Sequence, residues 1–174
     1  MTEKYDAFAT DANFQAYFAK IFEHDRWANE VVFEVMTSLG DALPEKPLDR
    51  LSHLITCQRL WLSRLTDDFD EPETIFPKWS LDETKRNAEP IFAGMRRFIE
   101  ELPEEDYHRS FAFTNMEGHA YTLLRRDIFT QLGQHGAYHR GQIAMELNPL
   151  LDKCVTTDYV YYTWMKAESV TSLQ

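Results

Sequence analysis

The segment Ile128–Ile143 reads IFTQLGQHGAYHRGQI and places His135 and His139 four residues apart. Its apolar and histidine residues recur at steps of three and four, the spacing of one face of an α-helix. The series comprises Ile128, Leu132, His135, His139, Ile143 and Leu147. Side chains four apart on a helix have Cβ atoms roughly 6 Å from one another. The segment therefore predicts a helix whose core-facing side presents two imidazoles that can bind one metal ion together.

The residues around the two histidines bear on whether the pair is a protease motif, a structural pair or a metal site. Gly136 follows His135, where HExxH metalloproteases carry the glutamate that activates water, so protease chemistry is disfavoured. An isolated histidine pair is more often two hydrogen-bonded core side chains than a metal site. Gly133, Gly136 and Gly141 each destabilise a helix interior by about 1 kcal/mol relative to alanine. Three such residues indicate that a partner helix or a ligand approaches this backbone closely.

The composition is that of one globular domain, which we place at residues 1–174. The chain is 44% hydrophobic and 14% aromatic, and this length can bury a substantial core. Its net charge is −11 and its pI is near 4.9, so its surface repels phosphate backbones. We therefore expect no direct nucleic-acid partner.

The cysteines and the N-terminus indicate a cellular compartment. Cys57 and Cys154 lie far apart and match neither a CxxC motif nor a disulfide framework, which is typical of a reducing environment. The N-terminal residues MTEKYDAF form no apolar signal region, and no apolar run approaches the length of a membrane span. We expect a cytoplasmic protein without a membrane partner.

Periodicity predicts an all-α fold with one small β-hairpin. Four long helices are expected, over Asp11–Leu39, Leu48–Leu65, Ser80–Leu102 and Leu123–Asn148. Gly40 ends the first helix, and Ser80 with Glu83 forms a capping box at the third. Arg109–Thr114 alternates like a strand and pairs with Ala120–Thr122 across a turn. A short aromatic helix is expected from Asp158 onward.

Two polar residues interrupt the apolar face of the first predicted helix. Asp25 lies within that face and His24 borders it, although an unpaired polar side chain is costly to bury. The favoured interpretation is a structural hydrogen bond from Asp25 to a neighbouring helix. The alternative places Asp25 or His24 at the rim of a metal pocket.

A third metal ligand is suggested by the second predicted helix. His53 lies at the edge of its apolar face, one turn before Cys57. An isolated histidine is more often a surface or core residue than a ligand. Metal sites in helical bundles are nevertheless assembled from side chains on facing helices, which makes His53 a candidate.

Several motifs resemble the DinB family across nearly the whole chain. They are LSHL around His53, the run HGAYHRGQI from His135, and TDYVYY near the C-terminus; HDRWAN at His24 also resembles the first helix of the family. The resemblance implies a four-helix bundle with a DinB-like up-down-down-up arrangement, often dimeric. It also implies a divalent metal ion bound by His53, His135 and His139.

Three imidazoles leave a coordination position open, as in catalytic zinc sites. Zinc or nickel suits such a nitrogen-rich site. Some relatives in the family bind a low-molecular-weight thiol at the open position, which implies a metal-dependent thiol transferase or hydrolase of unknown substrate. The alternative is a non-catalytic binding or stress protein whose ion stabilises the bundle.

Two further expectations concern Arg140 and assembly. Arg140 and Gln142 follow His139 and are candidates to orient it or a substrate. Arg140 points about 100° away from His139 around the helix, so a structural salt bridge is favoured for it. The stretch Tyr159–Trp164 carries four aromatic residues, more than one short helix can bury on a bundle face, and predicts a homodimer.

Overall fold

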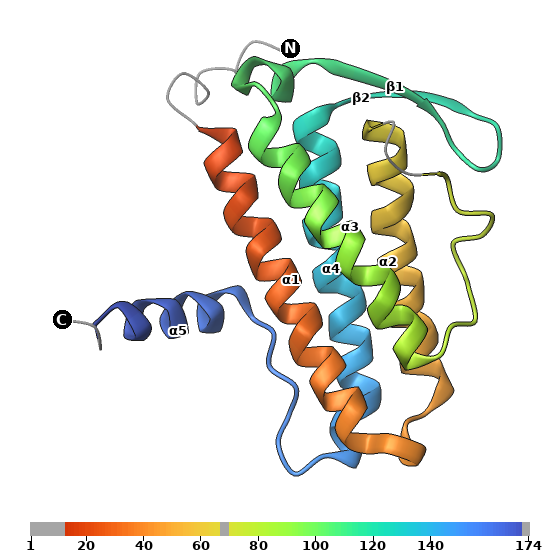
Figure 1. Cartoon of the computed structure of the whole chain (residues 1–174), viewed down its shortest axis with the longest axis vertical. Coiled ribbons are helices and arrows are strands. Elements are labelled where there is room, and N and C mark those ends of the chain that lie inside the picture. Colours follow the sequence, from red (N-terminus) through yellow and green to blue (C-terminus); the bar gives the residue numbers. More distant parts are fainter. Residues whose placement is uncertain (1–12, 67–69, 172–174) are drawn as a thin grey trace, which may run out of the picture.

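The computed structural model describes residues 13–66 and 70–171, and four long helices form its bundle (Figure 1). They are α1 (Phe14–Leu39), α2 (Glu45–Leu65), α3 (Leu81–Glu101) and α4 (Arg125–Leu147). Helix α1 packs against α3 and α4, and α2 packs against the same two helices, so α1 and α2 stand diagonally opposite. Helices α1 and α4 run in one direction and α2 and α3 in the other (Figure 1). This confirms the up-down-down-up arrangement.

The ends of the helices follow from local sequence. The Asn13 side chain accepts a hydrogen bond from the backbone of Ala16 at 2.8 Å and caps α1, and Gly40 ends it with a φ of 51°. Ser80 and Glu83 form the expected capping box of α3. Helix α2 begins at Glu45 rather than Leu48, because Pro47 falls in the first turn, where a missing N–H costs nothing. Residues 11 and 12 of the first predicted helix lie outside the described part of the chain.

The predicted hairpin lies across one end of the bundle (Figure 1). Strand β1 (Ser110–Thr114) pairs antiparallel with β2 (Ala120–Leu124) in the register Ser110↔Leu124. Gly118, with a φ of 86°, supplies the left-handed residue of the turn. Strand β2 continues through Leu124, so α4 begins at Arg125 and not at Leu123. The structure thus confirms the hairpin and corrects the start of the fourth helix.

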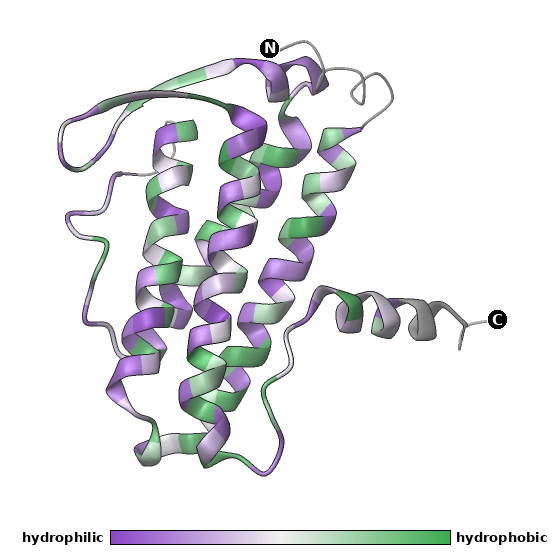
Figure 2. Cartoon of the chain, turned by 180° about the vertical axis from the view of Figure 1, so that it is seen from behind, coloured by the Kyte–Doolittle hydropathy of each residue, from purple (hydrophilic) through white to green (hydrophobic). Residues whose placement is uncertain are grey.

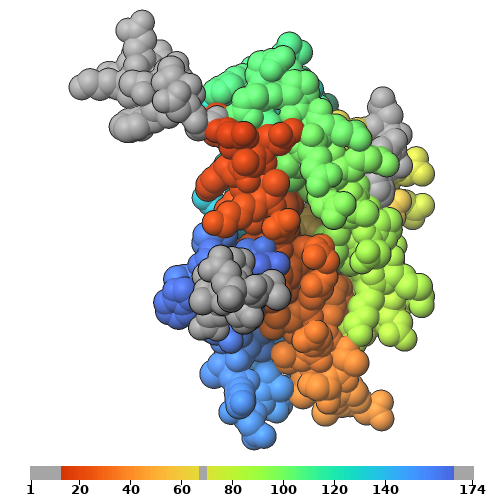
Figure 3. All heavy atoms as spheres, turned by 60° about the vertical axis from the view of Figure 1, so that its left-hand side comes forward, coloured from red at the N-terminus to blue at the C-terminus, as the bar shows by residue number. Residues whose placement is uncertain are grey.

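The C-terminal helix α5 (Tyr159–Thr171) projects away from the bundle (Figures 1 and 2). In a space-filling view its first residues lie against the side that α1 and α4 form (Figure 3). Short 3-10 helices follow α1, α3 and α4 at Gly40–Ala42, Glu104–His108 and Asn148–Leu150.

The core lies between the four long helices. Hydrophobic and hydrophilic residues alternate along each of them (Figure 2), and the apolar ones meet inside. The fully buried residues include Val32, Met36, Leu51, Leu54, Ile128, Phe129 and Leu147. Each such side chain stabilises the fold by about 1.5–3 kcal/mol through removal from water. Over the described residues, no helix combines the length and hydrophobicity that crossing a membrane requires.

Candidate metal centre

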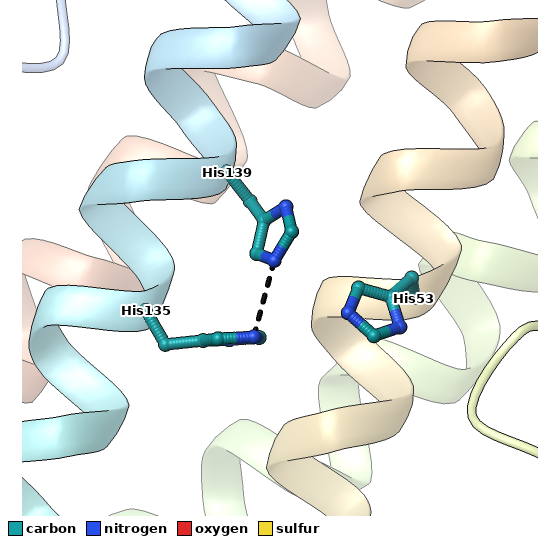
Figure 4. Close-up of side chains that lie close together, drawn as sticks. All are labelled: His53, His135 and His139. Carbon is teal, nitrogen blue, oxygen red and sulfur yellow. Dashed lines mark hydrogen bonds between the residues drawn. The ribbon is translucent and has the colours of Figure 1, made fainter.

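The bundle brings the three predicted histidines together, His53 from α2 and His135 and His139 from α4 (Figure 4). We call them the histidine triad. The Nε2 atoms of His135 and His139 are 3.1 Å apart, and the ring of His53 lies 4.9 Å from that of His139 between centroids. One possible ligand atom from each residue lies within 4.8 Å of the others. Two nitrogens on one tetrahedral zinc ion, each about 2.1 Å from it, would be roughly 3.4 Å apart. The spacing of the triad is therefore close to that of a metal site.

The position of the triad follows from the packing of α2 against α4. Ile128, Leu132, Ile143 and Leu147 of the predicted stripe are buried, as expected. His135 and His139 lie on the same stripe but are only half-buried, and the side chain that meets them from α2 is His53. The stripe is thus polar at one level of the bundle.

The orientation of His53 is fixed on several sides. Its Nδ1 lies 2.7 Å from the carbonyl oxygen of Ile75, which can only accept, so Nδ1 carries the proton and Nε2 keeps a free lone pair. The ring of Phe76 stacks on His53 with a centroid distance of 4.5 Å. The sulfur of Cys57 lies at similar distances from both ring nitrogens, 3.7 and 3.6 Å, so it contacts the ring rather than one nitrogen.

A chain of hydrogen bonds fixes His139 in the same way. Arg50, which can only donate, binds the Oε1 atom of Gln142 at 3.0 Å. That oxygen must therefore accept from Nδ1 of His139 as well, at 3.1 Å. Nε2 of His139 is left with its lone pair directed at His135. Second partners of this kind orient metal-binding histidines in proteins generally.

The histidines of α4 are held in the form that binds metals. Burial, together with the neighbouring His139 and His53, lowers the pKa of His135 to about 4. Burial and His53 also lower the pKa of His139 below its usual value. Both imidazoles are therefore neutral at pH 7, and binding a cation would release no proton from them. The donor set fits a divalent ion such as zinc or nickel.

A pocket of ≈ 420 Å³ opens onto the triad. His53 and His139 form part of its wall, and the other lining residues are Lys46, Asp49, Arg50 and Phe76. Small-molecule sites in proteins commonly enclose about 300–1,000 Å³. A small ligand can thus approach two of the three histidines from solvent. We call this space the triad pocket.

The sequence model of the DinB family matches residues 9–171, nearly the whole chain. The chain belongs to the DinB family. No curated protein and no solved structure matches it. The DinB match includes all three histidines of the triad, and it confirms the resemblance carried by the HGAYHRGQI run.

A second polar cluster lies beside the triad in this DinB-family chain. We call it the buried polar network; it comprises Asp25, Asn29, Gln58 and Arg140, each at most 3% exposed. Arg140 donates to Oδ1 of Asp25 at 2.5 Å and to Asn29 at 3.1 Å, while Gln58 donates to Oδ2 of Asp25 at 2.5 Å. The structural interpretations of Asp25 and Arg140 are therefore confirmed.

His24 takes no part in either cluster. Its Nε2 lies 2.8 Å from the carbonyl oxygen of Thr157, and its ring contacts Tyr159 and Tyr162 of α5. Burial lowers the pKa of His24, which favours the neutral ring that donates to Thr157. The alternative that placed His24 at the rim of the metal pocket is wrong, because the residue docks α5 onto α1.

The glycines of α4 divide into two kinds. A Cβ atom at Gly133 would lie 3.0 Å from Ile21, and one at Gly136 would collide with the Asp25 carboxylate. The expected close approach is therefore real at these two positions, and the approaching element is α1. Nothing lies within 4 Å of a Cβ atom at Gly141, so that glycine is not explained by packing within the described chain.

Proposed function

We propose that this DinB-family protein binds one divalent ion, zinc or nickel, through His53, His135 and His139 and uses it to activate a small thiol or water. The activity that we propose is a metal-dependent thiol transfer or hydrolysis. The observation that best supports it is the triad pocket, because a space of ≈ 420 Å³ beside His53 and His139 leaves room for an exogenous ligand. A purely structural ion needs no such access.

The chemistry follows from the ligand set. An ion held by three neutral imidazoles keeps a position for an exogenous group, lowers the pKa of bound water to about 7, and stabilises a thiolate. The protein itself holds the imidazoles in place, since Ile75 and Gln142 fix the protonated nitrogens of His53 and His139. Their Nε2 atoms therefore need no reorientation before they bind.

Thiol transfer has more support than hydrolysis. A hydrolase benefits from a general base near the activated water. Among the described residues that line the triad pocket, Asp49 is the one carboxylate, and Lys78 pairs with it at 2.5 Å. A thiolate needs little further activation once it has lost its proton.

Cobalt substitution tests whether the site is open. Elemental analysis should find about one divalent ion per chain, and the visible spectrum of the cobalt protein should change when millimolar thiol or imidazole is added. Turnover in a panel of thiol-transfer reactions, with and without metal, then separates catalysis from binding. If no exogenous ligand alters the spectrum, the non-catalytic alternative replaces the proposal, with an ion that only ties α2 to α4.

We also propose that the protein is a homodimer. Helix α5 projects from the bundle and leaves large apolar side chains exposed, namely Tyr159, Val160, Tyr161 and Trp164. Apolar groups gathered on one element are typical of an interface. Light scattering at micromolar concentration should give the mass of two chains, and a monomer mass would contradict the proposal.

A further inference from the structure

The triad pocket is lined by more positive than negative charge, although the chain as a whole has a net charge of −11. Its charged lining residues are the cations Lys46 and Arg50 and the anion Asp49. Asp49 is already paired with Lys78, whose Nζ lies 2.5 Å from Oδ2. The two cations thus face the pocket without an unpaired carboxylate on its wall.

Lys46 and Arg50 share a single counter-charge. Glu146 of α4 lies 2.7 Å from Nζ of Lys46 and 3.2 Å from Nε of Arg50. Lys78 beside them pairs with Glu45 at 3.3 Å as well as with Asp49, so the charges around the pocket nearly balance, and the local feature is a pair of cations that share one carboxylate. Local charge of this kind attracts anions even when the whole protein is acidic, because distant charges are screened by salt.

Arg50 also has N–H donors that make no hydrogen bond within the described residues. A guanidinium carries five N–H groups. Arg50 uses Nε for Glu146 and Nη1 for Gln142, whereas its Nη2 makes no hydrogen bond within residues 13–66 and 70–171. The side chain is 29% exposed, so its free N–H groups can reach a ligand in the pocket.

Phe76 adds an apolar side chain to the lining of the triad pocket. Phe76 stacks on His53 with an angle of 6° between the rings, yet 66% of the residue is exposed. One face of the ring therefore covers a metal-binding histidine while the other remains accessible at the pocket mouth. An apolar portion of a ligand can pack there.

We propose that the ligand of the triad pocket is a small organic acid, whose carboxylate is bound by Lys46 and Arg50 while a second group, such as a thiol, reaches the ion. This inference rests on the proposed function, because it requires an accessible ion on the triad. Phe76 contacts the carbon chain between the two groups. The substrate class is thus a short anionic thiol rather than a neutral or cationic one.

A matched series of three thiols tests the charge preference. Binding of 3-mercaptopropionate, its neutral amide 3-mercaptopropionamide, and the cationic 2-aminoethanethiol is followed by the visible spectrum of the cobalt-substituted protein. We expect the carboxylate to bind about tenfold more tightly than the amide, as a charge-assisted hydrogen bond at a half-exposed site allows. The cation should bind most weakly, and the preference should shrink at high salt.

Variants assign the preference to the two cations. Lys46→Gln and Arg50→Gln should each reduce the carboxylate-to-amide affinity ratio several-fold. The ratio is the readout because Arg50 also supports Gln142, and any change in the metal site affects both ligands equally. Arg59→Gln is the matched control, since Arg59 lies on the opposite face of α2 and its Nε donates to the backbone of Asp70. It should leave the ratio unchanged.

The outcomes separate the two proposals. Equal binding of the three thiols, or an unchanged ratio in both Lys46→Gln and Arg50→Gln, overturns the assignment of an anionic ligand and leaves the open metal site standing. A spectrum that none of the thiols changes overturns both.

Discussion

Helix α4 carries two polar clusters on neighbouring faces, and they differ in what they leave unsatisfied. His135 and His139 face α2, and His139 also lines the triad pocket, whereas Arg140 faces α1 and the buried polar network. The side chains of Arg140 and Asp25 are only 1% and 3% exposed, and their charges cancel at 2.5 Å. The network therefore neutralises its own charges, and its two atoms without a hydrogen-bond partner among the described residues, Nε of Arg140 and Oε1 of Gln58, are buried out of reach of a ligand.

The triad has the opposite character. Ile75 and Gln142 occupy the protonated nitrogens of two histidines, and the remaining lone pairs point at one another and toward a space that solvent can enter. Nitrogen lone pairs that are held this close together are stabilised when a cation binds between them. Burial alone therefore does not distinguish the two clusters; the triad differs because its free acceptors lie beside a space that solvent can enter.

Loss of a triad histidine should give the largest effect. His135→Ala or His139→Ala should reduce metal content from about one ion per chain to a small fraction, because two imidazoles hold a divalent ion far more weakly than three. Elemental analysis after gel filtration measures the content. His24→Ala is the control and should retain the ion, since His24 binds Thr157 instead. Full metal content in His135→Ala would show that the triad is not the site.

Breaking the buried polar network should affect folding instead. Asp25→Asn leaves the Arg140 charge buried without its counter-ion, and such a loss typically costs about 3–5 kcal/mol of unfolding free energy. Denaturant unfolding of the metal-free protein measures it. The double variant Asp25→Asn, Arg140→Met removes the unpaired charge and should be more stable than Asp25→Asn alone. A double variant that loses at least the sum of the two single losses would contradict a simple ion pair.

Much of this contrast could be predicted from the sequence, because it depends on helical periodicity. The i, i+4 spacing of His135 and His139 placed them on one face, and the 100° step from His139 to Arg140 separated the two clusters. Gly133 and Gly136 signalled the close approach of a partner, and the structure identifies the partner as α1.

The supporting contacts of the triad were harder to predict. Ile75 and Phe76 belong to the connection between α2 and α3, which has no periodicity, so nothing local indicated that it folds back onto His53. Arg50 reaches Gln142 across two helices, a pairing set by tertiary packing. Gln142 was the exception, because the sequence offered it as a residue that orients His139, and the i, i+3 spacing places its amide within reach of the ring.

Gln142→Leu should give an intermediate effect that separates ligand orientation from folding. Without Oε1, Nδ1 of His139 loses its acceptor, and losses of this kind typically weaken metal binding about 10–100-fold. Competition with a chromophoric chelator measures the dissociation constant. Gln134→Leu, at an exposed position of the same helix, is the matched control and should keep the wild-type constant. Equal affinities for both variants would mean that the Gln142 contact does not support the site.

Mild acid should destabilise the metal-free protein through the triad and not through the buried polar network, and this effect should be the smallest of the four. An imidazole titrates in mild acid, whereas the guanidinium of Arg140 does not. In the metal-free protein the pKa of His135 is lowered from 6.5 to about 4. Below pH 6.5 the His135 imidazole therefore binds a proton in the unfolded chain but stays neutral in the folded protein. The free energy of unfolding falls as the pH drops toward 4, and the contribution of His135 is fully present above pH 6.5. Denaturant midpoints at several pH values measure this slope. His135→Gln should flatten it, while His24, whose pKa is also lowered, contributes equally to both proteins and cancels in the difference. An unchanged slope in His135→Gln would mean that the triad does not resist protonation, and the contrast between the two faces of α4 would then rest on access alone.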